Sequence, residues 1–229
     1  MHFNTLILIK TERRKEKVFM SREMLTFFRT VIAMICGACL LVGCSTTTKL
    51  RSPLPIRNFD KISDEVIGLY IPEESKHYVW RGNINVTKYN VEFGNALEAN
   101  AKHALSKIYS EVVPIDHFPL DPLPNNGITR ALSLEIARAN VSPGGATFST
   151  SSAELQLRAE LASDSQLERE VIVAEGKGDA SPGAAGCIPL FFINNIAYNK
   201  ALQKANEQAM AHALDRLIDA IIEHDRKTK

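Results

Sequence analysis

The chain has 229 residues, of which 45% are hydrophobic and 23% charged, and its formal net charge is +1. These values are typical of a single globular domain and exclude a disordered or fibrous chain. Seven of the 27 basic and three of the 26 acidic residues precede Cys44, which leaves 20 basic and 23 acidic residues, a net charge of −3, in the rest of the chain. A slightly acidic body lacks the basic surface of a nucleic-acid-binding protein, so we expect no nucleic-acid partner.

An uncharged apolar run of fourteen residues, TVIAMICGACLLVG, follows Arg29. It is too short to span a bilayer as a helix, which takes about 20 residues. Its length and its basic N-terminal flank are typical of the apolar region of a secretory signal. We therefore predict a signal peptide over residues 1–43 and expect translation to begin at Met20 or Met24. The alternative is a long basic segment that begins at Met1.

The apolar run ends in Leu41-Val42-Gly43-Cys44, which resembles the lipobox of bacterial lipoproteins. The resemblance implies that the Cys44 thiol is alkylated by diacylglycerol, that the chain is cut after Gly43 and that the new amine is acylated. Ser45 stands where an aspartate marks retention at the inner membrane, so the resemblance implies attachment to the outer membrane, facing the periplasm. An ordinary signal peptide that happens to contain Cys44 is the alternative.

The residues that follow, 44–60, include STTTKLRSPLP and are predicted to form a lipidated, polar tether. Cys39 is a poorer lipidation site than Cys44 because Cys36, not an aliphatic residue, stands three positions before it. Only Cys187 then remains in the mature chain, which excludes an intrachain disulfide. We expect this thiol to be buried, with pairing between chains as the alternative.

Residues 61–229 alternate between strand and helix patterns. The expected elements in chain order are a strand at Asp64–Ile71, one or two extended segments around Ile84, an amphipathic helix at Phe93–Ser110, a strand at Glu111–Ile115, a loop at 116–128, strands at 132–136, 155–161 and 170–174, and a long alanine-rich helix at about 195–223. They predict one α+β domain, in which an antiparallel or mixed sheet carries two helices, one of them the long C-terminal helix, packed on one face.

The lipobox, the helix start FGNALEANAKHAL and the alanine-rich C-terminal helix together resemble the small α+β envelope lipoproteins of the YajG-like and PelC-like families. PelC-like proteins form rings in polysaccharide export, which adds self-association to the expectations. The resemblance assigns no further residue.

No motif with catalytic or metal-binding chemistry stands out. The five histidines after Cys44 form no His-Glu-x-x-His pair, and GKGD at 176–179 lacks the first glycine and the Ser/Thr of a phosphate loop. A zinc site built from distant positions and a Cys187 nucleophile are the remaining alternatives. We therefore predict no catalytic residue, metal or cofactor, and no enzymatic activity.

One apolar stretch is unusual, and it is interpreted either as a buried strand under the last helix or as an exposed surface for a partner, a membrane or an apolar ligand. Its residues are Cys187, Ile188, Leu190, Phe191, Phe192 and Ile193. The sequence as a whole favours a membrane-anchored accessory or assembly factor that binds envelope proteins or its own copies. A carrier of lipids or other apolar ligands is the second hypothesis, and an envelope hydrolase the third.

Overall fold

The chain divides into two compact units, Met1–Gly43 and Cys44–Lys229, in this computed structural model. The structure describes residues 27, 30, 31, 45–84, 87–118, 127–144, 149–163, 166–182 and 191–228. Of the first unit it therefore describes Phe27, Thr30 and Val31, which are helical. No helix among the described residues is long and apolar enough to cross a membrane. The second unit is called the body below.

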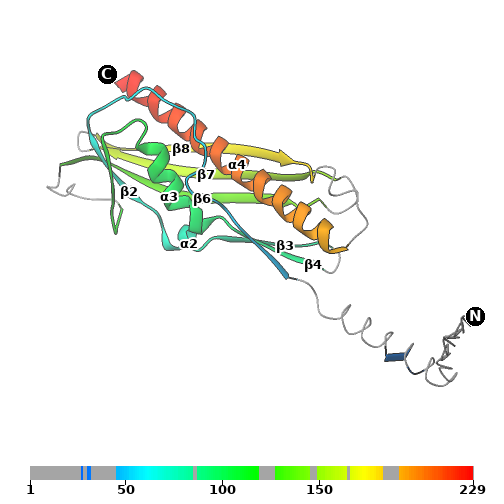
Figure 1. Ribbon diagram of the computed structural model, residues 1–229. Helices are drawn as coiled ribbons and strands as arrows, with labels where there is room; N and C mark the ends of the chain where they lie inside the picture. Colours follow the sequence, from blue (N-terminus) through cyan, green and yellow to red (C-terminus); the bar gives the residue numbers. More distant parts are fainter. Residues whose placement is uncertain are drawn as a thin grey trace, which may run out of the picture. The chain divides into compact units, whose positions relative to one another are not determined.

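The strands that the structure describes in the body form two β-sheets (Figure 1). The larger sheet has the strand order β5 (Glu111–Pro114), β2 (Val66–Tyr70), β6 (Ile128–Ser142), β7 (Ser151–Ser163) and β8 (Gln166–Ala180). The smaller sheet has the order β1 (Ser45–Lys49), β4 (Thr87–Glu92) and β3 (Val79–Ile84). In the larger sheet β2 is parallel to both of its neighbours, whereas β6, β7 and β8 are antiparallel. The sheet is therefore mixed, within the range that the sequence predicts.

Alternation of apolar and polar side chains sets the two faces of the larger sheet. On β7, Leu155, Leu157 and Ala159 are buried, while the residues between them, Gln156 and Arg158, are only partly covered. Successive side chains of a strand point to opposite faces, so this pattern leaves one face packed and the other wet. We call the wet side of β6, β7 and β8 the open face.

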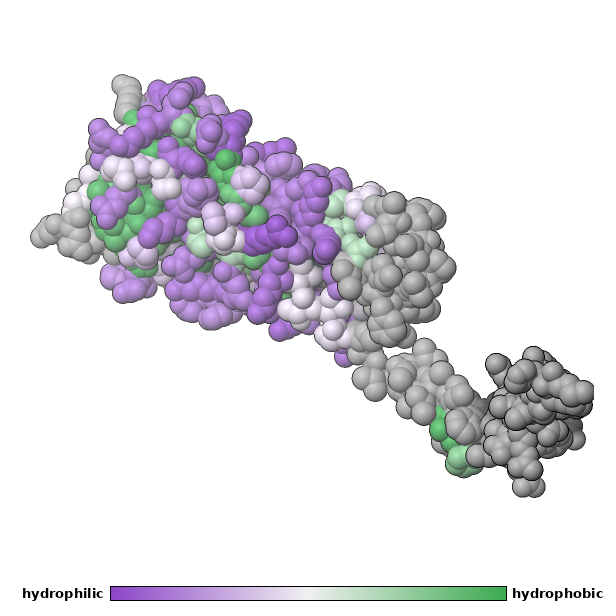
Figure 2. Space-filling view, in the orientation of Figure 1, coloured by the Kyte–Doolittle hydropathy of each residue, from purple (hydrophilic) through white to green (hydrophobic). Residues whose placement is uncertain are grey.

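The described residues of the body also form three helices: α2 (Glu73–Lys76), α3 (Gly94–Leu105) and α4 (Phe191–Thr228). The long helix α4 lies over β7 and β8 (Figure 1). It contacts α3 where the Asn100 amide donates a hydrogen bond to Met210 Sδ at 3.6 Å. Polar residues cover most of the face seen in Figure 2, with small apolar patches between them. The predicted α+β class with a long C-terminal helix is confirmed; the second sheet and the one-turn helix α2 are additions.

The contact between α4 and the sheet is close because small residues meet there. A methyl group added at Gly176 would overlap the backbone of α4 at Ala209, and one at Gly178 would overlap it at Ala205. Both alanines are fully buried. Backbone approaches backbone here, which glycine permits because it has no side chain. The backbones of α4 and β8 are therefore in direct contact at these two positions.

Candidate functional site

The predicted site residues fall largely outside the described part of the chain. This applies to Gly43, Cys44, Cys187, Ile188 and Leu190. Phe191, Phe192 and Ile193 form the first turn of α4, and the structure describes their backbone but not their side chains. The lipidation site and the predicted apolar surface therefore remain predictions.

The segment after Cys44 is not a tether. Strand β1 begins at Ser45 and pairs in parallel with β4, with Ser45 opposite Lys88 and Lys49 opposite Glu92. The three consecutive threonines suit a strand because β-branched side chains fit the pleated surface. The predicted polar tether over residues 44–60 is thus wrong for residues 45–60, which belong to the folded body.

Buried hydrogen bonds hold the rest of this segment. Asn100 on α3 is fully buried; its Oδ1 accepts from the Leu54 N–H at 2.8 Å and its Nδ2 donates to the Arg51 carbonyl at 3.2 Å. The side chains of Leu54 and Ile56 join the core. A buried amide with partners for both ends fixes a segment better than apolar contact alone, because unpaired main-chain groups are costly to bury.

The same segment also runs along α4. The Arg51 N–H donates to Glu207 Oε1 at 3.1 Å, and the Arg57 N–H donates to Asp215 Oδ1 at 3.0 Å. Arg57 further pairs with Asp219 through its guanidinium group. Because increasing residue numbers meet increasing numbers on α4, the segment and the helix run in the same direction.

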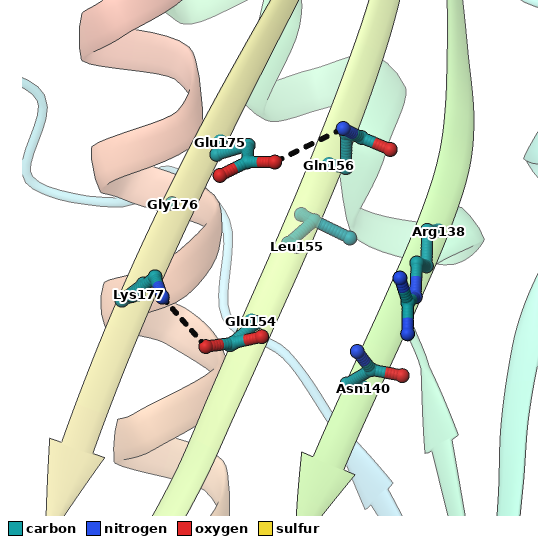
Figure 3. Close-up of a pocket in the computed structure, with 8 residues that line it drawn as sticks. All are labelled: Arg138, Asn140, Glu154, Leu155, Gln156, Glu175, Gly176 and Lys177. Atoms are coloured by element: carbon teal, nitrogen blue, oxygen red, sulfur yellow. Dashed lines mark hydrogen bonds and ion pairs between the residues drawn. The ribbon is translucent and has the colours of Figure 1, made fainter.

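Charged side chains form a ladder across the open face (Figure 3). Lys177 Nζ lies 2.7 Å from Glu154 Oε1, and Gln156 Nε2 donates to Glu175 Oε1 at 3.0 Å. The hydrogen bond and the charge of Lys177 hold the pKa of Glu154 below its usual range, and Glu154 raises the pKa of Lys177 in return. These side chains, with Arg138, line a shallow pocket of about 60 Å³. All of them are charged or amide groups, so the pocket offers polar contacts.

A wider groove of about 490 Å³ continues from this pocket toward the smaller sheet. Trp80 on β3 lines it together with Asn140, Glu154, Lys177 and Asp179. The groove combines an aromatic wall with polar and charged groups, a composition that is common in protein contact surfaces. The open face and this groove together form a continuous polar surface, since Asn140, Glu154 and Lys177 line both the pocket and the groove.

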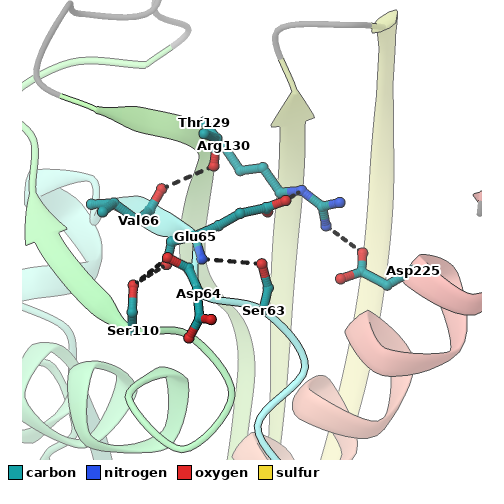
Figure 4. Close-up of polar contacts among 8 residues, drawn as sticks. All are labelled: Ser63, Asp64, Glu65, Val66, Ser110, Thr129, Arg130 and Asp225. Atoms are coloured by element: carbon teal, nitrogen blue, oxygen red, sulfur yellow. Dashed lines mark hydrogen bonds and ion pairs between the residues drawn. The ribbon is translucent and has the colours of Figure 1, made fainter.

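A partly buried ion cluster joins β6 to the last turns of α4 (Figure 4). The Arg130 guanidinium pairs with Asp225, whose side chain is 2% exposed. The Nε atom of Arg130 also lies 3.2 Å from Glu65 Oε2. Tyr109 lies beside the cluster, and its burial raises the pKa of its phenol to about 12. Removal of either partner would leave a buried charge uncompensated, so β6 and α4 are coupled through this cluster.

The histidines are spread over the body. His212 Nδ1 lies 2.6 Å from the Lys177 carbonyl, His224 pairs with Glu170, and His77 Nε2 lies 3.4 Å from Glu73 Oε2. Within the described ranges, no group of three or more His, Cys, Asp or Glu side chains is placed to hold a metal ion.

Three features escaped the sequence analysis, and two of them leave a signal in the sequence. Asn100 lies three and four residues from Leu97 and Ala104 on the apolar face of α3, so its polar side chain on that face marks a buried hydrogen-bonding group. The spacing of Gly176 and Gly178 places both glycines on one face of β8, which marks a close approach of another backbone. The pairing of Arg130 with Asp225 leaves no local signal because the two residues are 95 positions apart.

No protein-family model matches the chain, and no curated protein matches it. Its fold is similar to that of a Xanthomonas campestris protein of the family DUF330, with a TM-score of 0.45, 12% identity, and coverage of 80% of this chain and 97% of the other. It is also similar to a minor lipoprotein from Acinetobacter baumannii, with a TM-score of 0.35, 10% identity, and coverage of 71% and 90%. Because both TM-scores are below 0.5, the proposals below rest on the residues of this chain.

Proposed function

We propose that the mature protein is a bacterial envelope lipoprotein, anchored through Cys44, that acts as a non-enzymatic accessory or assembly factor. One observation carries the proposal: two independent boundaries coincide. The lipobox resemblance places the cut after Gly43, and the division of the chain into compact units falls between Gly43 and Cys44. Among the described residues, the hydrophobic core and the side chains packed on it begin at Leu50. Loss of residues 1–43 would therefore leave that core complete.

The location at the outer membrane, facing the periplasm, follows from the resemblance and from Ser45 after the cysteine. Three acyl chains on one residue would hold the protein far more firmly than a single chain, which binds membranes only marginally. The anchor would thus concentrate the body at the membrane surface, where an accessory protein meets its partners.

The open face is the surface that we assign to partner binding. Val171 and Val173 on β8 are 49% and 56% exposed, and they are the large hydrophobic side chains most exposed among the described residues of the body. β8 is an edge strand of fifteen residues. Exposed apolar side chains beside unpaired main-chain groups favour the addition of a strand from a partner.

Two experiments test this function. In the first, Cys44→Ser should release the protein from the membrane fraction, whereas Cys39→Ser should leave it there; retention of the Cys44→Ser protein would contradict the anchor. In the second, a photo-crosslinker at Val173 in intact cells should capture one defined envelope protein or a second copy of the chain. The same crosslinker at the exposed Glu98 of α3 is the control, and equal capture at both positions would contradict a specific open-face contact.

A further inference from the structure

The described residues next to Cys44 form one end of the body, called the basic end below. β1 starts at Ser45, β4 runs parallel to it from Thr87, and β3 runs antiparallel to β4, so that Asn83 lies opposite Lys88. The starts of two strands and the end of a third therefore meet beside the predicted attachment point.

The start of α4 lies at the same end (Figure 1). β1 contacts α4. Tyr89 of β4 lies near Tyr198 of α4: burial raises the pKa of the Tyr89 phenol, and Tyr198 adds a smaller increase. The chain after β1 then follows α4 toward its C-terminal end, as the contacts of Arg51 with Glu207 and of Arg57 with Asp215 show. The helix thus leads away from the basic end.

The charged residues of the strands and helix turn that meet at this end are mainly basic. The described residues of β1 and β3, of β4 as far as Val91, and of α4 from 197 to 204 contain five basic residues and no acidic one. The five are Lys49, Arg81, Lys88, Lys200 and Lys204, and all are exposed. None of them forms an ion pair with another residue that the structure describes, whereas Lys177 and Arg158 on the open face are paired with acids. The nearest acids are Glu92, which lies opposite Lys49 in the register of β1 and β4, and Glu154 and Asp179, which line the groove together with Trp80.

We propose that the basic end is a membrane contact surface, on which Arg81, Lys88 and Lys200 bind the anionic headgroups of phospholipids. The inference rests on the proposed lipidation of Cys44. A spacer over residues 44–60 would have extended up to roughly 60 Å and let the body move freely. Since β1 begins one residue after the anchor, lipid attachment instead brings the basic end against the bilayer and holds the body in one orientation.

Charge complementarity argues for a phospholipid surface as the occupant. A basic residue close to an anionic leaflet strengthens attachment about fivefold, and the attraction fades within a Debye length of roughly 8 Å. Unpaired basic residues contribute only where they lie at the surface itself, which is where the anchor would place them. The helix α4, of 38 residues, would then carry the Arg130 cluster up to about 50 Å from the membrane.

The test uses lipidated full-length protein in vesicles of phosphatidylethanolamine with phosphatidylglycerol, and in vesicles of phosphatidylcholine alone. A fluorophore is attached through Asn83→Cys at the basic end, or through Glu223→Cys on the last turns of α4, each in a Cys187→Ser background. A quencher on the lipid headgroups reports proximity. In the anionic vesicles we expect quenching about tenfold stronger at position 83 than at position 223, and weaker quenching at position 83 in phosphatidylcholine.

The charge-reversed pair Lys88→Glu with Lys200→Glu should reduce quenching at position 83 to its level in phosphatidylcholine. The pair Lys102→Glu with Arg216→Glu makes the same change in net charge outside the basic end and should leave quenching unchanged. Equal quenching at both reporters, or equal loss in both pairs, would overturn the inference. An intact mass without lipid on Cys44 would overturn the proposed function and this inference together, whereas lipidated protein that lacks the reporter difference overturns the inference alone.

Discussion

Replacement of Asn100 by alanine tests whether residues 51–56 are held by the body. The substitution removes the buried hydrogen bond from the Leu54 N–H and the partly buried one to the Arg51 carbonyl. Each main-chain group left unpaired costs about 1–3 kcal/mol. Alanine favours a helix more than asparagine does, by up to about 0.7 kcal/mol. We therefore expect the free energy of unfolding to fall by about 2–4 kcal/mol.

Urea unfolding of the detergent-extracted protein measures this change, with Asn95→Ala as the matched control. Asn95 lies on the exposed side of the same helix and bonds only to Glu92 among the described residues. Its loss should change the free energy of unfolding by no more than about 0.5 kcal/mol. Hydrogen exchange should also accelerate at the amide of Leu54 in the Asn100 variant. A decrease below about 1 kcal/mol with unchanged exchange at Leu54 would refute the packing of this segment.

Three further predictions concern the remaining contacts. Gly176→Ala should destabilise the body by about 1–3 kcal/mol in the same urea assay because the added methyl group overlaps the backbone of α4. Lys177→Ala, the control, should change the free energy of unfolding by less than about 1 kcal/mol. Equal effects of the two substitutions would contradict the close packing. Asp225→Ala should cost about 3–5 kcal/mol because it leaves the Arg130 charge without its most buried partner, and a neutral result would contradict the cluster. Folding raises the pKa of Tyr109 from 10.0 to about 12, so in this range the folded protein keeps a phenol proton that the unfolded chain loses. The free energy of unfolding should therefore fall by about 2–3 kcal/mol as the pH rises from about 10 to 12. Tyr109→Phe should remove that decrease.

The sequence predicts the parts of the fold in which local pattern and tertiary burial agree. β7 alternates apolar and polar residues along its length, and the apolar positions are those that α4 covers. Phe93, Leu97 and Ala104 follow helical spacing and are all buried. In these elements the side-chain period alone determines which face is buried, so the pattern is readable without the partner elements.

β1 could not be predicted in the same way. Ser45–Lys49 contains no large apolar residue, and its strand conformation depends on pairing with β4, about forty positions away. The charges and the proline that follow it suggest a solvated spacer. In a solvated spacer, water would form the hydrogen bonds to the main chain. Here the Asn100 amide forms them with the Arg51 carbonyl and the Leu54 N–H. Contacts between distant residues therefore determine the conformation of this strand, which the local sequence does not indicate.

The candidate site was predicted less well than the fold for a similar reason. A lipobox is a local motif, so Cys44 can be proposed from the sequence alone. The open face and the basic end are assembled from strands far apart in the chain, and their charged residues look like ordinary solvated positions until the sheets bring them together. Lys88 and Lys200 illustrate this, because they lie at the same end of the body although 112 positions separate them.

The intact mass and N-terminal sequence of the protein extracted from membranes test the central claim most directly. The account predicts a mature chain that begins at Cys44 and carries a diacylglycerol thioether and an amide-linked acyl chain on that residue. A mature chain that begins at another residue, or a Cys44 without lipid, would contradict the account.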